Sequence, residues 1–205
     1  MFRRVGTRVA QRPVPFDTDR PAVEAARRDP QRFDALYRKY VGQIYSFAVY
    51  ELRDHHAAED LTEQTFLRAL TALPRFQERG EGEGSTFRVW LFQICRNLAS
   101  NERRRRSRHP QALLDAAADI AAPDDPARVV VERDVAASAW RAVQDLPEDR
   151  RRALVLRFVD EMTTAEIAGV LGRSEGAVRV LIHRGLRSVA ERLTGPDELP
   201  GRRLD

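Results

Sequence analysis

The sequence over residues 160–193, DEMTTAEIAGVLGRSEGAVRVLIHRGLRSVAERL, contains the start and stop signals of two helices joined by a very short turn. Thr163 and Glu166 have the spacing of a capping box, in which each side chain satisfies a free backbone N–H at the start of a helix. Gly172 suits the left-handed conformation that ends a helix, and Ser174 can cap the next one. Two helices joined in this way form a helix-turn-helix, whose second helix enters the major groove of DNA.

The second of these helices separates apolar and basic side chains onto different faces. The apolar face is Val178, Ile182, Gly185, Val189 and Leu193, which we expect to pack inward. The residues expected to contact DNA follow the other face and the first turn: Ser174, Glu175, Arg179, His183, Arg184 and Arg187. The alternative interpretation is an ordinary amphipathic helix with a solvated arginine face.

Helical periodicity recurs along the rest of the chain, without a convincing alternating strand, so we expect an all-α protein. Asp29 and Pro30 are suited to the start of a helix, and the glycine-rich segment 74–85 is expected to be a loop. Inward positions are expected at Phe33, Leu36, Tyr37, Tyr40, Val41, Ile44, Phe47 and Ala48, then at Ala58, Leu61, Thr65 or Phe66, and Ala69, and after the loop at Phe87, Leu91, Ile94 and Leu98.

Composition divides the chain into two small helical domains. The expected parts are a flexible tail over 1–20, a first domain over 21–108, a flexible acidic linker over 109–127, a second domain over 128–195 and a second tail over 196–205. The first domain ends in four consecutive arginines, whereas the linker contains four aspartates and no arginine. The linker is either a plain tether or a segment whose charge mimics nucleic acid.

Basic residues number 35, and all but Lys39 are arginine, which suits bidentate contact with phosphate and guanine. Codon bias in a GC-rich genome explains the same preference. A single cysteine, Cys95, excludes an intramolecular disulfide, and its apolar neighbours predict a small buried side chain; no metal or cofactor is expected. Because no apolar stretch approaches about 18 residues and no apolar run follows the first arginines, we expect a cytoplasmic protein without membrane insertion.

Three segments resemble the extracytoplasmic-function (ECF) branch of the sigma-70 family of bacterial RNA polymerase sigma factors. They are AAEDLTEQTFLRAL (57–70), FRVWLFQICRNLASNERRRR (87–106) and residues 146–193, from LPEDRRRALVLRF to the end of the basic helix. The resemblance implies a sigma-2-like domain followed by a sigma-4-like domain. It also implies that the chain binds core RNA polymerase and promoter DNA, both duplex and melted strand, and that it is regulated by an anti-sigma factor.

The resemblance assigns roles to particular residues of the first domain. Asp60, Glu63 and Gln64 would contact polymerase, while the −10 promoter element would meet Phe76, Gln77, Arg88, Arg96, Asn97, Asn101, Arg103, Arg104, Arg105 and Arg106. The four consecutive arginines point around the whole helix, so we expect them to hold phosphates rather than read bases. The second domain would read the −35 element. The acidic loop and the stretch 100–102 depart from the family pattern. The base preferences of the loop in other family members therefore cannot be assigned to this chain.

Two other functions compete with the sigma factor. A stand-alone helix-turn-helix regulator would bind duplex DNA stably without polymerase. A nucleic-acid enzyme would need an acidic metal cluster, a phosphate-binding glycine loop with lysine, or a nucleophile with its base, and none is visible in the sequence.

Overall fold

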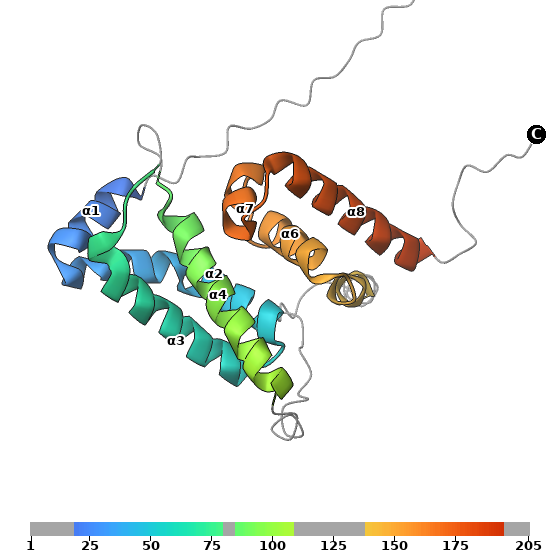
Figure 1. Ribbon diagram of the computed structural model, residues 1–205, viewed down its shortest axis with the longest axis horizontal. Coiled ribbons are helices and arrows are strands. Elements are labelled where there is room, and N and C mark those ends of the chain that lie inside the picture. The colour runs from blue at the N-terminus through green and yellow to red at the C-terminus, as the bar shows by residue number, and fades with distance from the viewer. Residues whose placement is uncertain (1–18, 80–84, 109–137, 195–205) are drawn as a thin grey trace, which may run out of the picture.

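The computed structural model describes residues 19–79, 85–108 and 138–194 (Figure 1). The elements in these ranges are α1 (Arg20–Arg28), η1 (Pro30–Phe33), α2 (Asp34–Leu52), α3 (His55–Ala72), η2 (Leu73–Arg75), α4 (Phe87–Arg108), α6 (Glu148–Phe158), α7 (Thr164–Leu171) and α8 (Glu175–Thr194). Residues 138–144 are helical as well, and the described ranges contain no strand, which confirms the all-α fold class. The expected linker, the glycines of the loop at 80–84 and most of the two tails lie outside the described residues.

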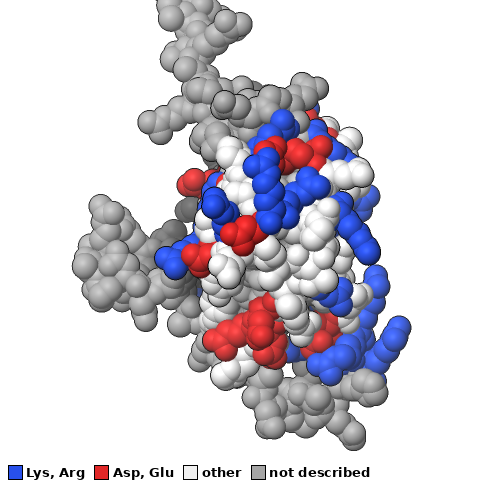
Figure 2. All heavy atoms as spheres, turned by 90° about the vertical axis from the view of Figure 1, so that its left-hand side faces the viewer, with Lys and Arg blue, Asp and Glu red and all other residues white. Residues whose placement is uncertain are grey.

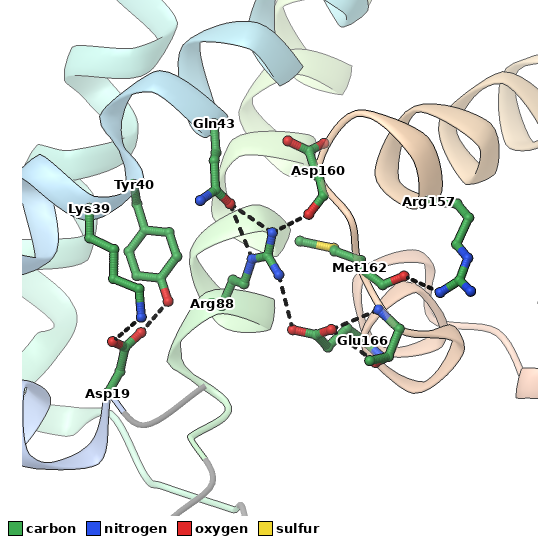
Figure 3. A network of polar contacts seen from close by, with 10 residues as sticks. Asp19, Lys39, Tyr40, Gln43, Arg88, Arg157, Asp160, Met162 and Glu166 are labelled. Carbon is green, nitrogen blue, oxygen red and sulfur yellow. Dashed lines mark hydrogen bonds and ion pairs between the residues drawn. The ribbon is translucent and has the colours of Figure 1, made fainter. Parts of the chain in front are cut away.

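Helix α1 is not predicted by the sequence analysis, which assigns residue 20 to a tail. It begins with Pro21 in its first turn, where the missing N–H of proline is harmless, and it buries Val23 and Ala26. Asp19, just before it, is buried and accepts hydrogen bonds from the Lys39 ammonium, at 2.5 Å, and from the Tyr40 hydroxyl (Figure 3). Because α1 has only nine residues, its buried pair does not repeat over further turns, and the sequence analysis places the start of the domain after it begins.

The N-terminal domain packs α2, α3 and α4 around an aromatic core. Asp29 accepts a hydrogen bond from Gln31 N as expected, although the first turn that it caps is a 3-10 helix. Phe33 meets Phe66 and Phe87 edge-on, with ring centroids 6.3 and 6.4 Å apart. The expected inward residues are buried except three: Val41 and Ile94 are half-buried and Tyr37 is 43% exposed. Tyr37 is exposed because it borders a surface groove between α2 and α3.

The C-terminal domain packs α8 across α6 and α7. Both halves of the Thr163–Glu166 capping box are present, and Gly172 ends α7 with a φ of 64°, so the expected helix-turn-helix signals are confirmed. Val178 and Gly185 are buried, but Leu193 is 43% exposed, against the expectation. Near this end of α8, Arg192 donates to the carbonyl of Ala142 at 2.8 Å, so the last turn contacts the helical residues 138–144 while Leu193 stays exposed.

The two domains lie against each other in the described structure. Helix α7 packs on α4, and α6 approaches α2 (Figure 1). A buried ion pair joins them: Arg152 of α6 donates through Nε and Nη2 to the two carboxylate oxygens of Glu51 in α2, at 2.6 and 2.7 Å. The face of α4 that meets α7 therefore lies inside the molecule.

Candidate nucleic-acid and polymerase interfaces

Helix α8 presents the expected basic face to solvent. Ser174 caps the helix by accepting from Ala177 N at 3.2 Å, and all six residues expected to contact DNA are exposed. Arg179 pairs with Glu175 at 3.1 Å and Arg187 with Glu191 at 2.8 Å, each one helical turn apart. Exposed pairs of this kind are worth only about 0.3–0.5 kcal/mol, so these arginines can exchange their partners for phosphate or base edges.

Helix α3 presents a polar face beside an apolar groove. Asp60, Glu63 and Gln64 are exposed, while Leu61 is buried. The adjoining groove has a volume of about 770 Å³ and is lined by Pro30, Phe33, Asp34, Tyr37, Val41, Tyr45, Glu59, Thr62, Glu63, Phe66, Leu67 and Leu70. Leu67 is 62% exposed at its edge. Carboxylate and amide groups next to an apolar groove suit a protein partner.

Figure 2 shows the side of the molecule that carries the N-terminal domain, and its charge is mixed. Acidic side chains gather in a patch on the lower part of this view, with basic ones beside it at the right-hand edge, and both signs occur together in the upper part, beyond an uncharged area. A surface that attracts a phosphate backbone is dominated by one sign of charge. This face therefore suits a protein partner better than DNA.

The loop before α4 is closed by one carboxylate. Glu78 accepts from Ser85 Oγ at 2.6 Å and from Thr86 N at 2.6 Å, and Ser85 Oγ in turn accepts from Phe87 N at 3.1 Å, at the start of α4. Beside this loop lies a cavity of about 410 Å³, lined by Arg75, Phe76, Gln77, Arg79, Thr86, Val89, Trp90 and Gln93. The cavity combines an aromatic wall with polar groups, which is the composition of a nucleobase pocket.

The expected contacts of the −10 element differ in their accessibility. Gln77, Asn97 and Asn101 are exposed. Phe76 is only 6% exposed because its ring packs against Trp90 and Phe87, with centroids 4.8 and 5.9 Å away. In this structure Phe76 supports the wall of the cavity.

Arg88 and Arg96 point into the contact between the domains. The Arg88 guanidinium binds Gln43 Oε1 at 2.8 Å, the carbonyl of Asp160, and the Glu166 carboxylate at 3.5 Å (Figure 3). Arg96 Nη1 donates to the carbonyl of Val170 at 2.7 Å. Their guanidinium groups are therefore already bound within the protein.

Three of the four consecutive arginines at the end of α4 also have acidic partners. Arg103 binds Glu51 at 3.0 Å and Glu148 at 2.6 Å, and Arg106 binds Asp54 and Glu102, both at 2.9 Å. Arg105 pairs with Glu102 at 2.8 Å. The hydrogen bond from Arg105 is the main reason that the pKa of Glu102 falls to about 2, and Arg106 acts in the same direction. Arg104 is exposed on the helix end.

Asp160 is a buried acid where the two domains meet. Its side chain is 4% exposed and its Oδ2 has no hydrogen-bond partner. Burial raises the pKa of Asp160 to about 7, although the nearby Arg88 charge opposes the shift. Its electrostatic neighbours include Tyr50 from α2 and Cys95 from α4, so this carboxyl faces the N-terminal domain.

Within the described ranges, no three His, Cys, Asp or Glu side chains converge as a metal ion would require. None of the helices in those ranges is long and apolar enough to cross a membrane. Cys95 is fully buried, as its apolar neighbours predict.

The fold and the exposed face of α8 define a two-domain helical protein that carries a helix-turn-helix. Family models described as "Sigma-70 region 2" and "Sigma-70, region 4" match residues 36–109 and 137–189. The ECF RNA polymerase sigma factor BldN of Streptomyces coelicolor is 34% identical over 170 residues, which cover 81% of this chain and 61% of BldN. The RNA polymerase sigma-H factor of Pseudomonas aeruginosa is 30% identical over 192 residues, covering 86% of this chain and 94% of the relative. This chain belongs to the ECF branch of the sigma-70 family.

A solved structure shares the arrangement of helices. It is the sigma factor RpoE of Bartonella quintana in complex with the anti-sigma factor NepR, with a TM-score of 0.62 over 81% of this chain and 98% of that chain. At 20% sequence identity the likeness shows the fold alone.

Proposed function

We propose that this chain binds core RNA polymerase, directs it to promoters through their −10 and −35 elements, and promotes strand opening. The observation that carries the proposal is the exposed basic face of α8, presented by a helix-turn-helix whose capping box and Gly172 turn are both formed. Membership of the sigma-70 family supports the polymerase as partner.

The −35 element would be read by the first turns of α8. Ser174 and Glu175 lie at its N-terminal end, the part of a recognition helix that meets base edges. The exposed side of α8 continues with Arg179, His183, Arg184 and Arg187. Along this series the proposed contacts change from base edges to the phosphate backbone. An arginine that binds O6 and N7 of guanine discriminates against other bases by about 1–3 kcal/mol.

Core polymerase would dock on α3 and the groove beside it. Asp60, Glu63 and Gln64 supply polar contacts, and Tyr37 and Leu67 offer exposed apolar surface that a partner would bury. Interfaces of this composition have an apolar centre and a polar rim.

The −10 element would meet α4 and the loop before it. A base flipped out of the duplex costs a few kcal/mol, which stacking and edge contacts in a pocket offset. The cavity between Gln77 and Trp90 is the candidate pocket, with Asn97 and Asn101 further along the helix. Of the residues expected from the family, Arg88 and Arg96 would have to leave their present partners, and Phe76 would have to turn outward. Arg103, Arg104, Arg105 and Arg106 would hold phosphates.

We propose that the chain regulates transcription without catalysing a reaction itself. The chain would act in the cytoplasm, as a sigma-2-like domain over 21–108 and a sigma-4-like domain over 128–195, joined by the linker at 109–127. An anti-sigma factor is the proposed regulator, because RpoE, which shares the fold, was solved with one.

The experiment is reconstitution with core RNA polymerase. The chain is mixed with core enzyme, the complex is isolated by gel filtration, and run-off transcription is measured on genomic fragments. We expect transcripts from a defined subset of fragments, and none with core enzyme alone. Stable binding of the free chain to duplex DNA with no association to polymerase would instead identify a stand-alone regulator.

A further inference from the structure

Ser107 carries one of the few exposed hydroxyl groups of the protein. Where the structure describes side chains, the exposed serines and threonines are Thr71, Ser107 and Ser174. The Thr71 hydroxyl donates to the Leu67 carbonyl at 2.8 Å between apolar neighbours, and Ser174 caps α8. Ser107 lies in the last turn of α4, one residue before the helix ends at Arg108. Because the last turn of a helix frays at low cost, an enzyme can reach this hydroxyl.

Arginines surround Ser107 in the sequence. The run is RRRRSR, residues 103–108, so an arginine occupies each of the four positions before the serine and the one after it. A protein kinase can select such a segment with carboxylates in its substrate groove, because guanidinium and carboxylate groups form paired, charge-assisted hydrogen bonds. The segment therefore has the composition of a substrate for an arginine-directed serine kinase.

The helix places arginines where a phosphate on Ser107 would meet them. Residues three and four positions apart are neighbours on a helix, so Arg104 and Arg103 lie one turn before Ser107. The Ser107 hydroxyl itself donates to the Arg104 carbonyl at 2.9 Å. Arg104 and Arg108 are exposed, whereas Arg103 already binds two acidic side chains. A phosphate on Ser107 would therefore bind Arg104 and Arg108 first.

This end of α4 stabilises negative charge. The hydrogen bond from Arg105 is the main reason that the pKa of Glu102 falls to about 2, and Arg106 acts in the same direction. A phosphoserine carries a charge of about −1.5 to −2 at neutral pH, and nearby arginines favour the doubly charged form. The helix dipole opposes an anion at a C-terminal turn, but direct pairing with guanidinium groups is the stronger effect.

We propose that Ser107 is a phosphorylation site for a serine protein kinase that recognises arginine, and that the phosphate neutralises arginines that would hold the promoter backbone. Ser107 Oγ forms a bond to the γ-phosphorus of a nucleoside triphosphate and gives up its proton. The bond from that phosphorus to the oxygen that bridges to the β-phosphate breaks, its electron pair stays on this oxygen, and the nucleoside diphosphate leaves. The effect on DNA rests on the proposed function, whereas the modification itself does not.

The size of the effect on promoter binding follows from the charge. A phosphate of charge about −2 cancels about two arginine contacts with DNA, which lowers the salt slope by about 1.4 to 1.8 units. At 0.1 M salt, relative to 1 M, each unit of slope is worth about a factor of ten, so affinity should fall about 25- to 60-fold. The ranking of promoters should stay the same, because backbone contacts carry no direct sequence information.

The first experiment determines whether the site is used. Full-length wild type, Ser107→Ala and Arg104→Gln are incubated with γ-labelled ATP and an extract of the bacterium that produces the chain, and the labelled residue is located by mass spectrometry. Wild type should be labelled on Ser107, Ser107→Ala should lose this label, and Arg104→Gln should be labelled several-fold more slowly. Absence of label from Ser107 overturns the modification site, and equal labelling of Arg104→Gln overturns recognition through arginine.

The second experiment measures what the phosphate does. Phosphoserine is introduced at position 107 of the full-length chain by stop-codon suppression, and the holoenzyme formed with core polymerase is titrated with promoter fragments at several salt concentrations. Glu24→phosphoserine is the matched control, because Glu24 is exposed on α1 and lies outside the proposed interfaces. The chain phosphorylated at Ser107 should show the reduced affinity and slope, and the control should bind as wild type does.

Equal affinity and equal salt slope with and without the phosphate on Ser107 would overturn its role in promoter binding. An equal loss of affinity in the Glu24→phosphoserine control would do the same, because the effect would then not depend on the arginines around Ser107. The proposed function fails separately if the unmodified wild-type holoenzyme transcribes no fragment, and the labelling result would then still stand.

Discussion

The pH dependence of stability should trace to Asp160. Burial raises its pKa to about 7 in the folded chain, from an ordinary value of 3.8. The folded state binds this proton more tightly than the unfolded state. The contribution of Asp160 to the free energy of unfolding is therefore complete below about pH 4 and is lost as the pH rises from about 4 to 7. The slope there is about 1.4 kcal/mol per pH unit.

The expected size follows from these two pKa values. Between pH 5 and pH 8, ionisation of Asp160 should lower the free energy of unfolding by about 2.5 kcal/mol. The groups facing this carboxyl are Arg88 and Cys95 from α4 and Tyr50 from α2. Of these, only Arg88 carries a charge that favours the ionised form of Asp160, so it limits the loss of free energy of unfolding on ionisation.

The assay is chemical denaturation of wild type and Asp160→Asn at pH 5, 6, 7 and 8. Asparagine keeps the shape of the side chain and cannot ionise, so the variant should lack this part of the pH dependence. Asp145→Asn, at an exposed position, serves as the control and should follow wild type. If the free energy of unfolding changed with pH equally in wild type and Asp160→Asn, the assignment of a buried, protonated carboxyl to this position would be refuted.

Three further predictions concern the proposed interfaces. Arg179→Ala should relax preference at one or two base pairs of the −35 element by about 1–3 kcal/mol in competition binding, and equal weakening on all promoters would make Arg179 a phosphate contact. The Asp60→Ala/Gln64→Ala variant should lose affinity for core polymerase with unchanged circular dichroism, and unchanged affinity would remove α3 from that interface. Arg104→Gln should flatten the salt dependence of promoter binding by about one unit and keep promoter ranking, whereas a changed ranking with the same slope would show base or shape readout.

The helix-turn-helix could be predicted from sequence because its signals are local. The capping box, the Gly172 turn and the Ser174 cap each need only a few neighbouring residues, and all three are formed. The apolar faces of α2, α3 and α4 could likewise be predicted from periodicity, since each pattern repeats over several turns. Helix α1 was missed because its nine residues are too few for the buried positions to repeat over several turns.

The contact between the domains could not be predicted, because it depends on residues far apart in sequence. Glu51 and Arg152 are 101 residues apart and each is an ordinary charged residue at the sequence level. Arg88 and Arg96 carry no local sign that the chain itself binds them. One weak signal exists: Glu51 is an acid within an apolar run, AVYEL, on the face of α2 that is otherwise buried. Acids at such positions need a partner.

The burial of Cys95 has a consequence for the signals that this protein can receive. Burial raises the pKa of its thiol to about 12, so the thiolate, which is the form that oxidants attack, is scarcely populated at neutral pH. It is also the only cysteine in the chain, so no second thiol is available to form an intramolecular disulfide with it. The single thiol of this chain is therefore poorly suited to sense an oxidant directly.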